Sequence, residues 1–187
     1  PVVVDPNTTL KAQYDTGALA RVDGDNPDSN FYEKVIEYLP DQAPPLNTTL
    51  TDATSTVMSI YADTDYIYVG SWDNNTYIYN KSDFTLNTTL TDATSGVRSV
   101  HADTDYIYVG SSDNNTYIYN KDFSLETTLT DATSYVYSVY ADTDYIYVGE
   151  GYPNTNKVYI YNKSDFTLNT TLSDASDDVY SVYADTD

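Results

Sequence analysis

The sequence contains no cysteine, a single histidine, and only eight lysine and arginine residues among 187. Without cysteine, neither a disulfide framework nor a thiolate metal site can form. No run approaches the roughly 18 apolar residues that a transmembrane helix needs, and the seven glycines and seven prolines are scarce inside the apolar runs. These shortages argue against a disulfide-stabilised module, a zinc ribbon and a membrane span.

Acidic residues dominate the charge, with 29 against eight basic ones and a net charge of -21. Such a surface repels nucleic acid and anionic membranes. Disorder is a poor interpretation, because 22 tyrosines and 40% hydrophobic residues provide ample material for a core. A folded, aspartate-rich surface is favoured in concentrated salt, where screening removes self-repulsion, so we expect a halophilic source. The alternative is an ordinary acidic protein from a mesophile or a calcium-rich medium.

An internal repeat is the main feature of the sequence. The segment YADTDYIYVG begins at Tyr61, returns at His101 and Tyr140, and starts again at Tyr183, at spacings of 40, 39 and 43 residues. Each repeat carries four runs rich in Val, Ile, Thr, Tyr or Phe, of the types VRSVHA, YIYVGS, TYIYNK and FTLNTTLT. Asp- and Asn-rich turn formers separate them. Four short strands per repeat of about 40 residues predict an all-β chain built from the four-stranded antiparallel blades of a β-propeller.

The stretch DATSGVRSVHADTDYIYVGSSDNNTYIYN resembles the WD-repeat family. Gly110, Ser111 and Asp113 match the end of the family's apolar strand and its aspartate turn. Asp92-Ala93 stands where the family has Gly-His, and Tyr119-Asn120 stands where it has Trp-Asp. The resemblance therefore implies the blade architecture but not the family's Asp-His-Ser-Trp hydrogen-bond network. Quinoprotein-like and Kelch-like propellers stay open as cousins.

Two parts are expected along the chain. Residues 1–45 lack the repeat and end in a Pro-rich linker, so they are interpreted as an attachment arm or, alternatively, a poorly ordered tail. Residues 46–187 hold about three and a half blades, from an outer strand at 47–52 to an inner strand at 179–184. Because propellers close with four to eight blades and the chain starts without methionine, we expect a processed product or fragment that continues beyond Asp187.

No catalytic residue is predicted. His101 occupies a position that is tyrosine in the other repeats, and the Asp-Thr-Asp segments are interpreted as turns between strands more readily than as calcium ligands. Oxygen ligands at alternating positions suit a hard cation. A calcium site is therefore a candidate at Asp23, Asp25 and Asp28, and no other cofactor is expected.

Partner contact is predicted in the loop that differs most between repeats, at Glu150, Tyr152, Pro153, Asn154 and Asn156; neutral drift of that loop is the alternative. Asn-x-Ser/Thr triplets make eight glycosylation candidates. They are Asn7, Asn47, Asn74, Asn80, Asn87, Asn114, Asn162 and Asn169.

These observations favour a non-enzymatic, extracellular structural or recognition module on a large assembly. The repeats are similar to those of surface and virion proteins of haloarchaeal systems, which implies a virus spike or fibre that binds a host. The alternatives are a haloarchaeal cell-surface glycoprotein and an exported enzyme that acts on polysaccharides. The expected partners are other subunits through the arm, and a cell-surface protein or glycan through the propeller loops.

Overall fold

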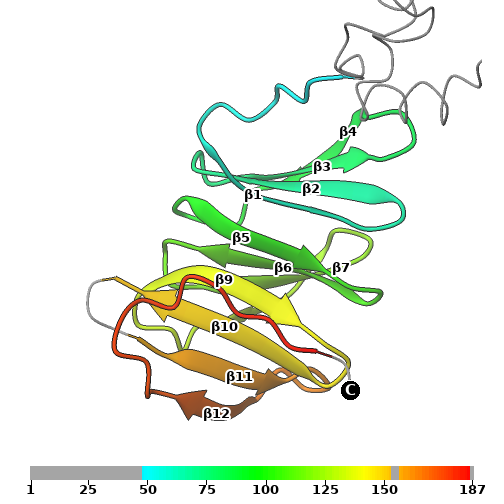
Figure 1. The fold of residues 1–187 in the computed structure, drawn as a ribbon. Coiled ribbons are helices and arrows are strands. Elements are labelled where there is room, and N and C mark those ends of the chain that lie inside the picture. The colour runs from blue at the N-terminus through cyan, green and yellow to red at the C-terminus, as the bar shows by residue number, and fades with distance from the viewer. Residues whose placement is uncertain (1–47, 153–155, 186–187) are drawn as a thin grey trace, which may run out of the picture. The chain divides into compact units, whose positions relative to one another are not determined.

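The computed structural model describes residues 48–152 and 156–185. The chain divides into two compact units, Pro1–Thr49 and Leu50–Asp187, and every described strand lies in the second. Within the described residues the regular secondary structure is entirely β, in three four-stranded sheets whose strands follow one another in sequence order (Figure 1). All strand pairs are antiparallel, so each repeat forms one blade, as predicted.

The strands have nearly the same bounds in each repeat. Blade 1 consists of β1 (Val57–Ala62), β2 (Tyr66–Ser71), β3 (Thr76–Asn80) and β4 (Leu86–Leu90). Blade 2 consists of β5 (Val97–Ala102), β6 (Tyr106–Ser111), β7 (Thr116–Asn120) and β8 (Leu125–Leu129). Blade 3 consists of β9 (Tyr135–Ala141), β10 (Tyr145–Gly151), β11 (Val158–Asn162) and β12 (Leu168–Leu172).

The core lies between consecutive blades. Tyr68 and Ile78 of blade 1 are fully buried together with Val97 and Ile107 of blade 2, and an equivalent cluster joins blades 2 and 3. Strands that are covered on both faces carry apolar or aromatic side chains on both, which explains the YIYVG pattern. Exposure shows the effect of a neighbouring blade: Ile60 is 66% exposed, whereas the equivalent Val100 is 5% exposed.

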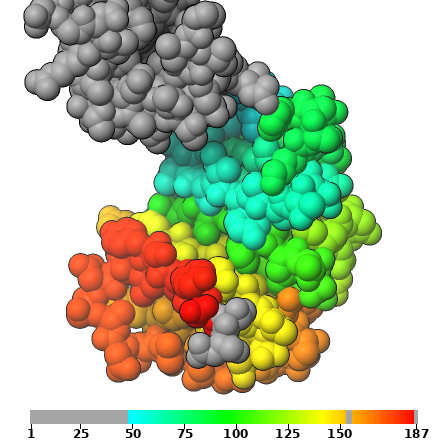
Figure 2. Space-filling view, turned by 45° about the vertical axis from the view of Figure 1, so that its right-hand side comes forward, coloured from blue at the N-terminus to red at the C-terminus, as the bar shows by residue number. Residues whose placement is uncertain are grey.

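A serine hydroxyl joins each inner strand to the next one. The backbone N–H of Val100 donates to Ser59 Oγ, that of Val139 to Ser99 Oγ, and that of Val182 to Ser138 Oγ, each at 3.0 Å. The third of these bonds places the segment after β12 against blade 3, where Val179 also approaches Gly149. Figure 2 shows this red C-terminal segment lying beside the yellow residues of blade 3.

The two strands expected at the ends of the repeat region are not formed as regular strands. Residues 48–52 and 179–184 are extended connections without ladder pairing in the structure. A strand requires a ladder of backbone hydrogen bonds with a neighbour, and among the described residues the segment 179–184 makes only one such bond, from the Val179 N–H to the Glu150 carbonyl oxygen at 3.2 Å. The segment 179–184 nevertheless occupies the inner-strand position of a fourth repeat, as its bond to Ser138 shows.

The turn between the third and fourth strands holds a phenylalanine in left-handed conformation in every blade. Phe84, Phe123 and Phe166 have φ of 60°, 71° and 58°, values that are costly for a bulky side chain. The rings of Phe123 and Phe166 pack edge-on against Tyr66 and Tyr106 of the preceding blade, with centroids 5.3 Å apart in both cases. In all three blades the phenylalanine N–H also donates to the carbonyl oxygen of the asparagine that ends the third strand, so a local hydrogen bond holds the turn and the blade contact adds to it where a preceding blade is present.

Candidate functional site on the blade rims

The Asp-Thr-Asp segments form tight turns at one rim of the blades. The Asp63 Oδ1 atom accepts hydrogen bonds from the backbone N–H groups of Asp65, at 2.9 Å, and Tyr66, at 2.8 Å. Asp103 and Asp142 make the same pair of bonds in blades 2 and 3. An aspartate that bonds the backbone two residues ahead is a standard turn former, so the first aspartate of each segment has a structural role.

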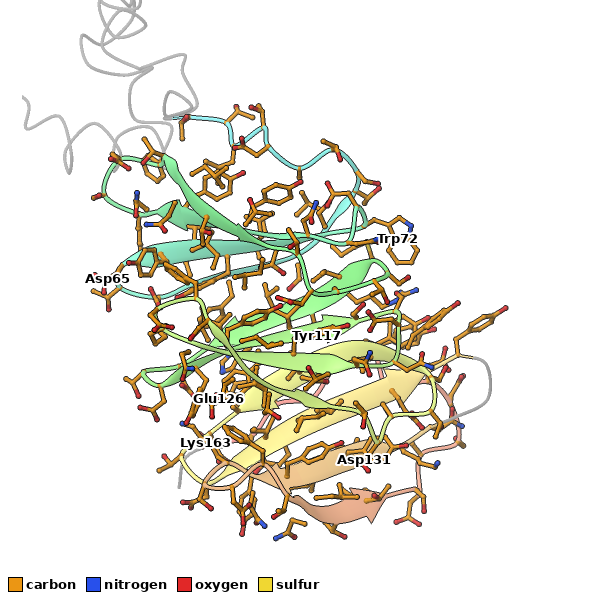
Figure 3. All side chains as sticks on the ribbon, turned by 180° about the vertical axis from the view of Figure 1, so that it is seen from behind. Asp65, Trp72, Tyr117, Glu126, Asp131 and Lys163 are labelled. Carbon is orange, nitrogen blue, oxygen red and sulfur yellow. The ribbon has the colours of Figure 1, made fainter. Side chains whose placement is uncertain are left out.

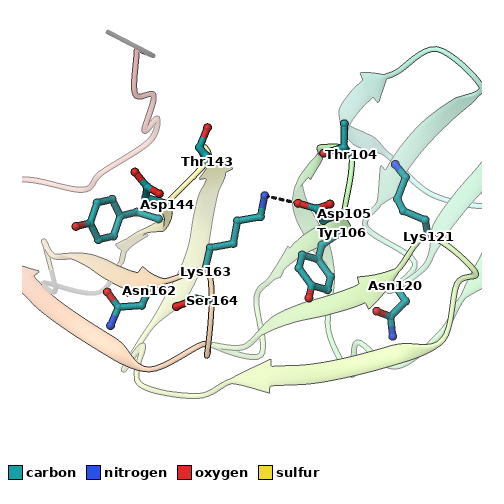
Figure 4. Close-up of a pocket in the computed structure, with 11 residues that line it drawn as sticks. Thr104, Asp105, Tyr106, Asn120, Lys121, Thr143, Asp144, Asn162, Lys163 and Ser164 are labelled. Atoms are coloured by element: carbon teal, nitrogen blue, oxygen red, sulfur yellow. Dashed lines mark hydrogen bonds and ion pairs between the residues drawn. The ribbon is translucent and has the colours of Figure 1, made fainter.

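A lysine from the following blade completes the turns of blades 1 and 2. Lys121 Nζ lies 2.8 Å from Asp63 Oδ2 and 3.0 Å from the Tyr68 hydroxyl. Lys163 Nζ lies 2.8 Å from Asp103 Oδ2 and 3.0 Å from Asp105 Oδ2, and Figure 4 shows the second of these contacts. Sequence reasoning missed these pairs, although the Asn-Lys and Asp-Thr-Asp segments that form them recur in every repeat.

The ion pairs set the protonation of this rim. Burial alone would raise the pKa of the Asp63 carboxyl, but hydrogen bonds from Lys121, Tyr68 and the backbone outweigh it and lower the pKa from 3.8 to about 2. The pKa of Asp103 is lowered in the same way, because Lys163 and the turn offset the effect of burial. These carboxylates are therefore charged at neutral pH and already have partners.

We call the edge of the blades formed by these turns and lysines, with Asp63, Asp103, Asp105, Lys121 and Lys163, the Asp-Lys rim. Two adjoining hollows open there, of about 780 and 840 Å³. Figure 4 shows the first, between the turns of blades 2 and 3, with Asp105, Lys121, Asp144 and Lys163 around it. The lysines and the turn aspartates that face each other are mostly paired. In the parts of the chain that the structure describes, no group of three His, Asp or Glu side chains is arranged to hold a metal ion. The ion pairs of the Asp-Lys rim therefore join neighbouring blades.

The single histidine stands in a column of aromatic rings on the inner strands. The His101 ring lies 4.8 Å from the ring of Tyr61 and 4.6 Å from that of Tyr140, and Tyr140 lies 4.9 Å from Tyr183. His101 Nε2 is 3.2 Å from the carbonyl oxygen of Ala141. Burial lowers the pKa of His101, which favours the neutral ring at pH 7. Packing and one backbone hydrogen bond account for the residue without catalysis.

At the opposite rim, tyrosine-aspartate pairs occupy the positions where the sequence departs from the WD pattern. The Tyr79 hydroxyl donates to Asp52 and the Tyr119 hydroxyl to Asp92, both at 3.0 Å. Tyr161 repeats the contact with Asp131 at 3.1 Å. The side chain that replaces tryptophan thus bonds the one that stands at the Gly-His position, so the network is replaced and not simply missing.

Glu150, predicted to contact a partner, is instead fully buried. Its carboxylate accepts hydrogen bonds from the backbone N–H groups of Thr133, at 2.7 Å, and Ser134, at 3.2 Å. In blade 2 the carboxylate of Asp113 bonds the equivalent Thr94. In blade 3 the longer loop leaves no aspartate at the position of Asp113, and Glu150 in β10 provides the equivalent carboxylate instead. A buried carboxylate that is already bonded to the backbone does not face a partner.

Other predicted site residues of this loop have different surroundings. Tyr152 is 57% exposed, and its ring stacks on Tyr135 with centroids 6.1 Å apart. Asn156 is half-buried. Pro153 and Asn154 lie outside the described residues, as do the candidate calcium ligands Asp23, Asp25 and Asp28. Partner contact through this loop stays a prediction.

The glycosylation candidates fall in two kinds of place. Asn74 and Asn114 take left-handed conformation, with φ of 74° and 71°, in the turn between the second and third strands. Asn80 and Asn162 end the third strands of their blades, and Asn87 and Asn169 are exposed in β4 and β12. Asn7 and Asn47 lie outside the described residues. Whether any of them carries a glycan stays a prediction.

An aromatic cluster surrounds Arg98 at the rim opposite the Asp-Lys rim, on the side where Figure 3 labels Trp72. The Arg98 guanidinium lies 4.7 Å from the Trp72 ring, 4.9 Å from Tyr135 and 4.3 Å from Tyr137. Its Nε donates to Ser112 Oγ at 2.6 Å. The cluster continues to Tyr180, whose ring centroid is 5.0 Å from that of Tyr137. Sequence reasoning did not find this cluster.

The repeats differ at several positions around this cluster, and elsewhere they differ mainly at His101 and in the turn between the third and fourth strands. Met58, Arg98, Tyr137 and Tyr180 are equivalent positions, and Trp72 is equivalent to Ser112. A further variable position holds Thr56, Gly96, Tyr135 and Asp178. We define these side chains, together with Tyr152, as the variable rim. Comparing the repeats position by position would have shown from the sequence alone that these positions vary, but not that they share one rim.

Comparison with known proteins agrees with the architecture. The family model described as WD domain, G-beta repeat matches residues 45–80 and 84–120. The described chain is thus an all-β, WD-repeat-like β-propeller assembly of four-stranded blades. A search of curated proteins finds no match. In the described residues no helix is both long and apolar enough to cross a membrane.

Proposed function

We propose that the chain is a non-enzymatic recognition module that binds a partner through the variable rim. WD-repeat propellers typically act as interaction scaffolds, but a fold alone does not specify a function. The observation that carries the proposal is the position of the repeat differences. The inter-blade contacts are nearly the same in each repeat, whereas the largest side-chain differences, apart from His101 and the turn between the third and fourth strands, gather at one surface. Trp72, Tyr152 and Tyr180 are 43%, 57% and 67% exposed there.

The chemistry of the variable rim also fits recognition. Interface hot spots are enriched in Trp, Tyr and Arg, and the rim combines one tryptophan, one arginine and several tyrosines. Aromatic side chains supply a large contact area at a small entropic cost. The Asp-Lys rim also carries tyrosines, such as Tyr106 and Tyr145, but they are the same in each repeat, and its charged groups are largely used to join blades.

We further propose that the module works outside the cell, on a large assembly in concentrated salt, with a spike or fibre of a halophilic archaeal virus as the leading case. The net charge of -21 supports the salt environment. Attachment to other subunits is assigned to residues 1–45. A haloarchaeal cell-surface glycoprotein is the second candidate, which the exposed Asn87 and Asn169 triplets favour. Mass spectrometry of the protein from its natural source would detect the glycans.

An adhesion assay tests the recognition function. Labelled protein is incubated in concentrated salt with a panel of haloarchaeal cells, and retention is compared among the wild type, a Trp72→Ala/Tyr180→Ala variant and a Tyr145→Ala control. Tyr145 is also an exposed tyrosine, but it lies at the Asp-Lys rim. We expect the cells to retain the wild type and the control but not the double variant. Equal retention of all three proteins, or no retention on any cell, would refute the proposal.

An enzymatic role has a separate test. The protein is incubated with neutral and acidic polysaccharides in concentrated salt, and newly formed reducing ends are measured. We expect no release above a heat-denatured control. Release that survives in the Trp72→Ala/Tyr180→Ala variant would place catalysis elsewhere on the chain.

A further inference from the structure

The variable rim already holds one cation among its aromatic rings. The guanidinium of Arg98 lies 4.3 to 4.9 Å from the ring centroids of Trp72, Tyr135 and Tyr137. These distances are well within the roughly 6 Å over which a cation is attracted to an aromatic face. A planar guanidinium also stacks on such rings better than an ammonium does. The contacts of Arg98 therefore show that the aromatic rings of this rim accept a guanidinium group.

The same rim continues into rings that no cation of the described residues covers. Tyr137 contacts Tyr180 at 5.0 Å between centroids, and Tyr135 stacks on Tyr152 at 6.1 Å. Among the described residues, no lysine or arginine lies over Tyr152 or Tyr180. At the position where blade 2 has Arg98, blade 3 has Tyr137 and the following segment has Tyr180. The described residues therefore supply no cation to Tyr152 and Tyr180, and a partner molecule can supply one.

A carboxylate lies between the uncovered rings. Asp178 Oδ1 accepts a hydrogen bond from the backbone N–H of Tyr152 at 2.6 Å, and its Oδ2 accepts one from the Tyr180 hydroxyl at 3.1 Å. Asp178 is half-buried. A carboxylate held beside two exposed aromatic rings can form a charge-assisted hydrogen bond with a guanidinium that stacks on them. The rings of Tyr152 and Tyr180 and the carboxylate of Asp178 are thus all suited to bind a guanidinium group.

The charge of the whole chain favours a cationic partner. With a net charge of -21, the surface attracts basic segments and repels acidic ones. In concentrated salt the long-range attraction is screened within a few ångströms. The short-range stacking of a guanidinium on an aromatic ring is less sensitive to that screening, so it would supply the selectivity under those conditions.

We propose that Tyr152, Tyr180 and Asp178 bind an arginine side chain from an exposed segment of a partner protein. The inference rests on the proposed recognition function and specifies its ligand chemistry. Arginine is favoured over lysine because its planar group matches both the ring faces and the carboxylate. A neutral glycan, which aromatic side chains can also bind, is an outcome of the test below.

The probes are three acetylated and amidated pentapeptides, Gly-X-Gly-X-Gly, with X as arginine, lysine or citrulline. Citrulline has nearly the shape of arginine but no charge. Binding to the full chain is measured at 1 M NaCl from the NMR shifts of the tyrosine ring resonances. We expect the arginine peptide to bind at least about fivefold more tightly than the citrulline peptide, as a cation-π contact of roughly 1 kcal/mol implies. It should also bind more tightly than the lysine peptide, because only the planar guanidinium matches both the rings and the carboxylate.

Variants then locate the site. Tyr152→Ala/Tyr180→Ala should weaken binding of the arginine peptide at least about fivefold, and Tyr152→Phe/Tyr180→Phe, which keeps the rings, should restore most of the binding. The matched control is Tyr145→Ala, an exposed tyrosine beside Asp142 and Asp144 at the other rim. It should leave the affinity unchanged. Far-UV circular dichroism confirms that each variant is folded.

Several results would overturn the inference. Equal affinity for the arginine and lysine peptides, or equally weakened binding in the rim variant and the Tyr145→Ala control, would show nonspecific attraction to an acidic surface. If a neutral oligosaccharide binds the wild type but not the rim variant, while no peptide binds, the rim is assigned to glycans. If cell adhesion depends on the rim but no arginine preference is found, only this inference fails. If the arginine preference holds and adhesion is absent, the proposed function fails and the site chemistry stands.

Discussion

Glycines at the blade interfaces lead to a prediction that two matched substitutions can test. Gly110 of β6 faces the inner strand of the next blade, and a Cβ atom added there would lie 2.6 Å from Cγ1 of Val136. Val136 is fully buried and its side chain is branched at Cβ. Neither it nor the surrounding strands can move away cheaply, because protein interiors are closely packed. Gly110→Ala should therefore force the two blades apart.

The expected cost follows from packing. Adding a methyl group to a well-packed core costs about 1 to 3 kcal/mol, and the reduced freedom of the unfolded chain offsets roughly 0.4 to 1 kcal/mol of it. A net decrease of about 1 to 2 kcal/mol in the free energy of unfolding corresponds to a melting temperature lower by roughly 2 to 8 °C for a chain of this size.

Gly96→Ala provides the control. A Cβ at Gly96 would lie equally close, 2.6 Å from Cε3 of Trp72, but that ring is 43% exposed and free to swing outward. The cost should be below about 1 kcal/mol, which is the strength of the exposed cation-π interaction between Trp72 and Arg98 that the swing would break. Because Trp72 is the only tryptophan, its fluorescence reports the movement directly. Urea unfolding gives the stability of both variants. The reasoning fails if Gly110→Ala is neutral, or if it changes the native tryptophan emission as much as Gly96→Ala does.

Three further predictions concern charge. The carboxyl of Asp63 has a pKa lowered to about 2, so its stabilising effect is present above its ordinary pKa and disappears as the pH falls from about 4 to 2. Lys121→Met should therefore reduce the drop in the urea midpoint between pH 5 and pH 3, and an unchanged drop would contradict this. Burial lowers the pKa of His101, so the unfolded chain takes up the proton first and the free energy of unfolding falls below about pH 6.5. His101→Tyr should reduce the change in urea midpoint between pH 7.5 and pH 5.5, and an unchanged slope would assign it to other groups. With a net charge of -21, the melting temperature should rise between about 0.1 and 1 M NaCl, where the Debye length shrinks from roughly 10 to 3 Å, and a constant or lower value would remove the argument for a halophilic source.

The sequence was sufficient to predict the blades. Their number of strands, antiparallel order and turn positions follow from the 40-residue period and from the alternation of apolar runs with Asp- and Asn-rich turns. The segments at 48–52 and 179–184 have the same composition as true strands but form no ladder in the structure. Composition reports the preference of a segment for extended geometry, whereas pairing depends on whether a neighbour is in place.

The site was less accessible to sequence reasoning. Lys121 and Asp63 meet only because blade 2 packs on blade 1, a geometry that is not written in either repeat alone. Glu150 belongs to the most divergent loop, which suggested contact with a partner, yet it replaces a structural carboxylate from a different position. The cluster around Arg98 was visible as a set of positions that differ between repeats, but its meaning required knowing that they share one rim.

The serine bonds between inner strands have a consequence for assembly during folding. Ser59, Ser99 and Ser138 each accept the same backbone bond from the following repeat, and the glycine and valine contacts around them are almost the same at each junction. A junction of this kind does not distinguish which repeat follows, or from which molecule it comes. At high concentration two chains can therefore exchange blades while keeping every native contact, a misassembly that is characteristic of repeat proteins. The differences at the variable rim, such as Trp72 packed on Gly96, are the features that favour the correct neighbour.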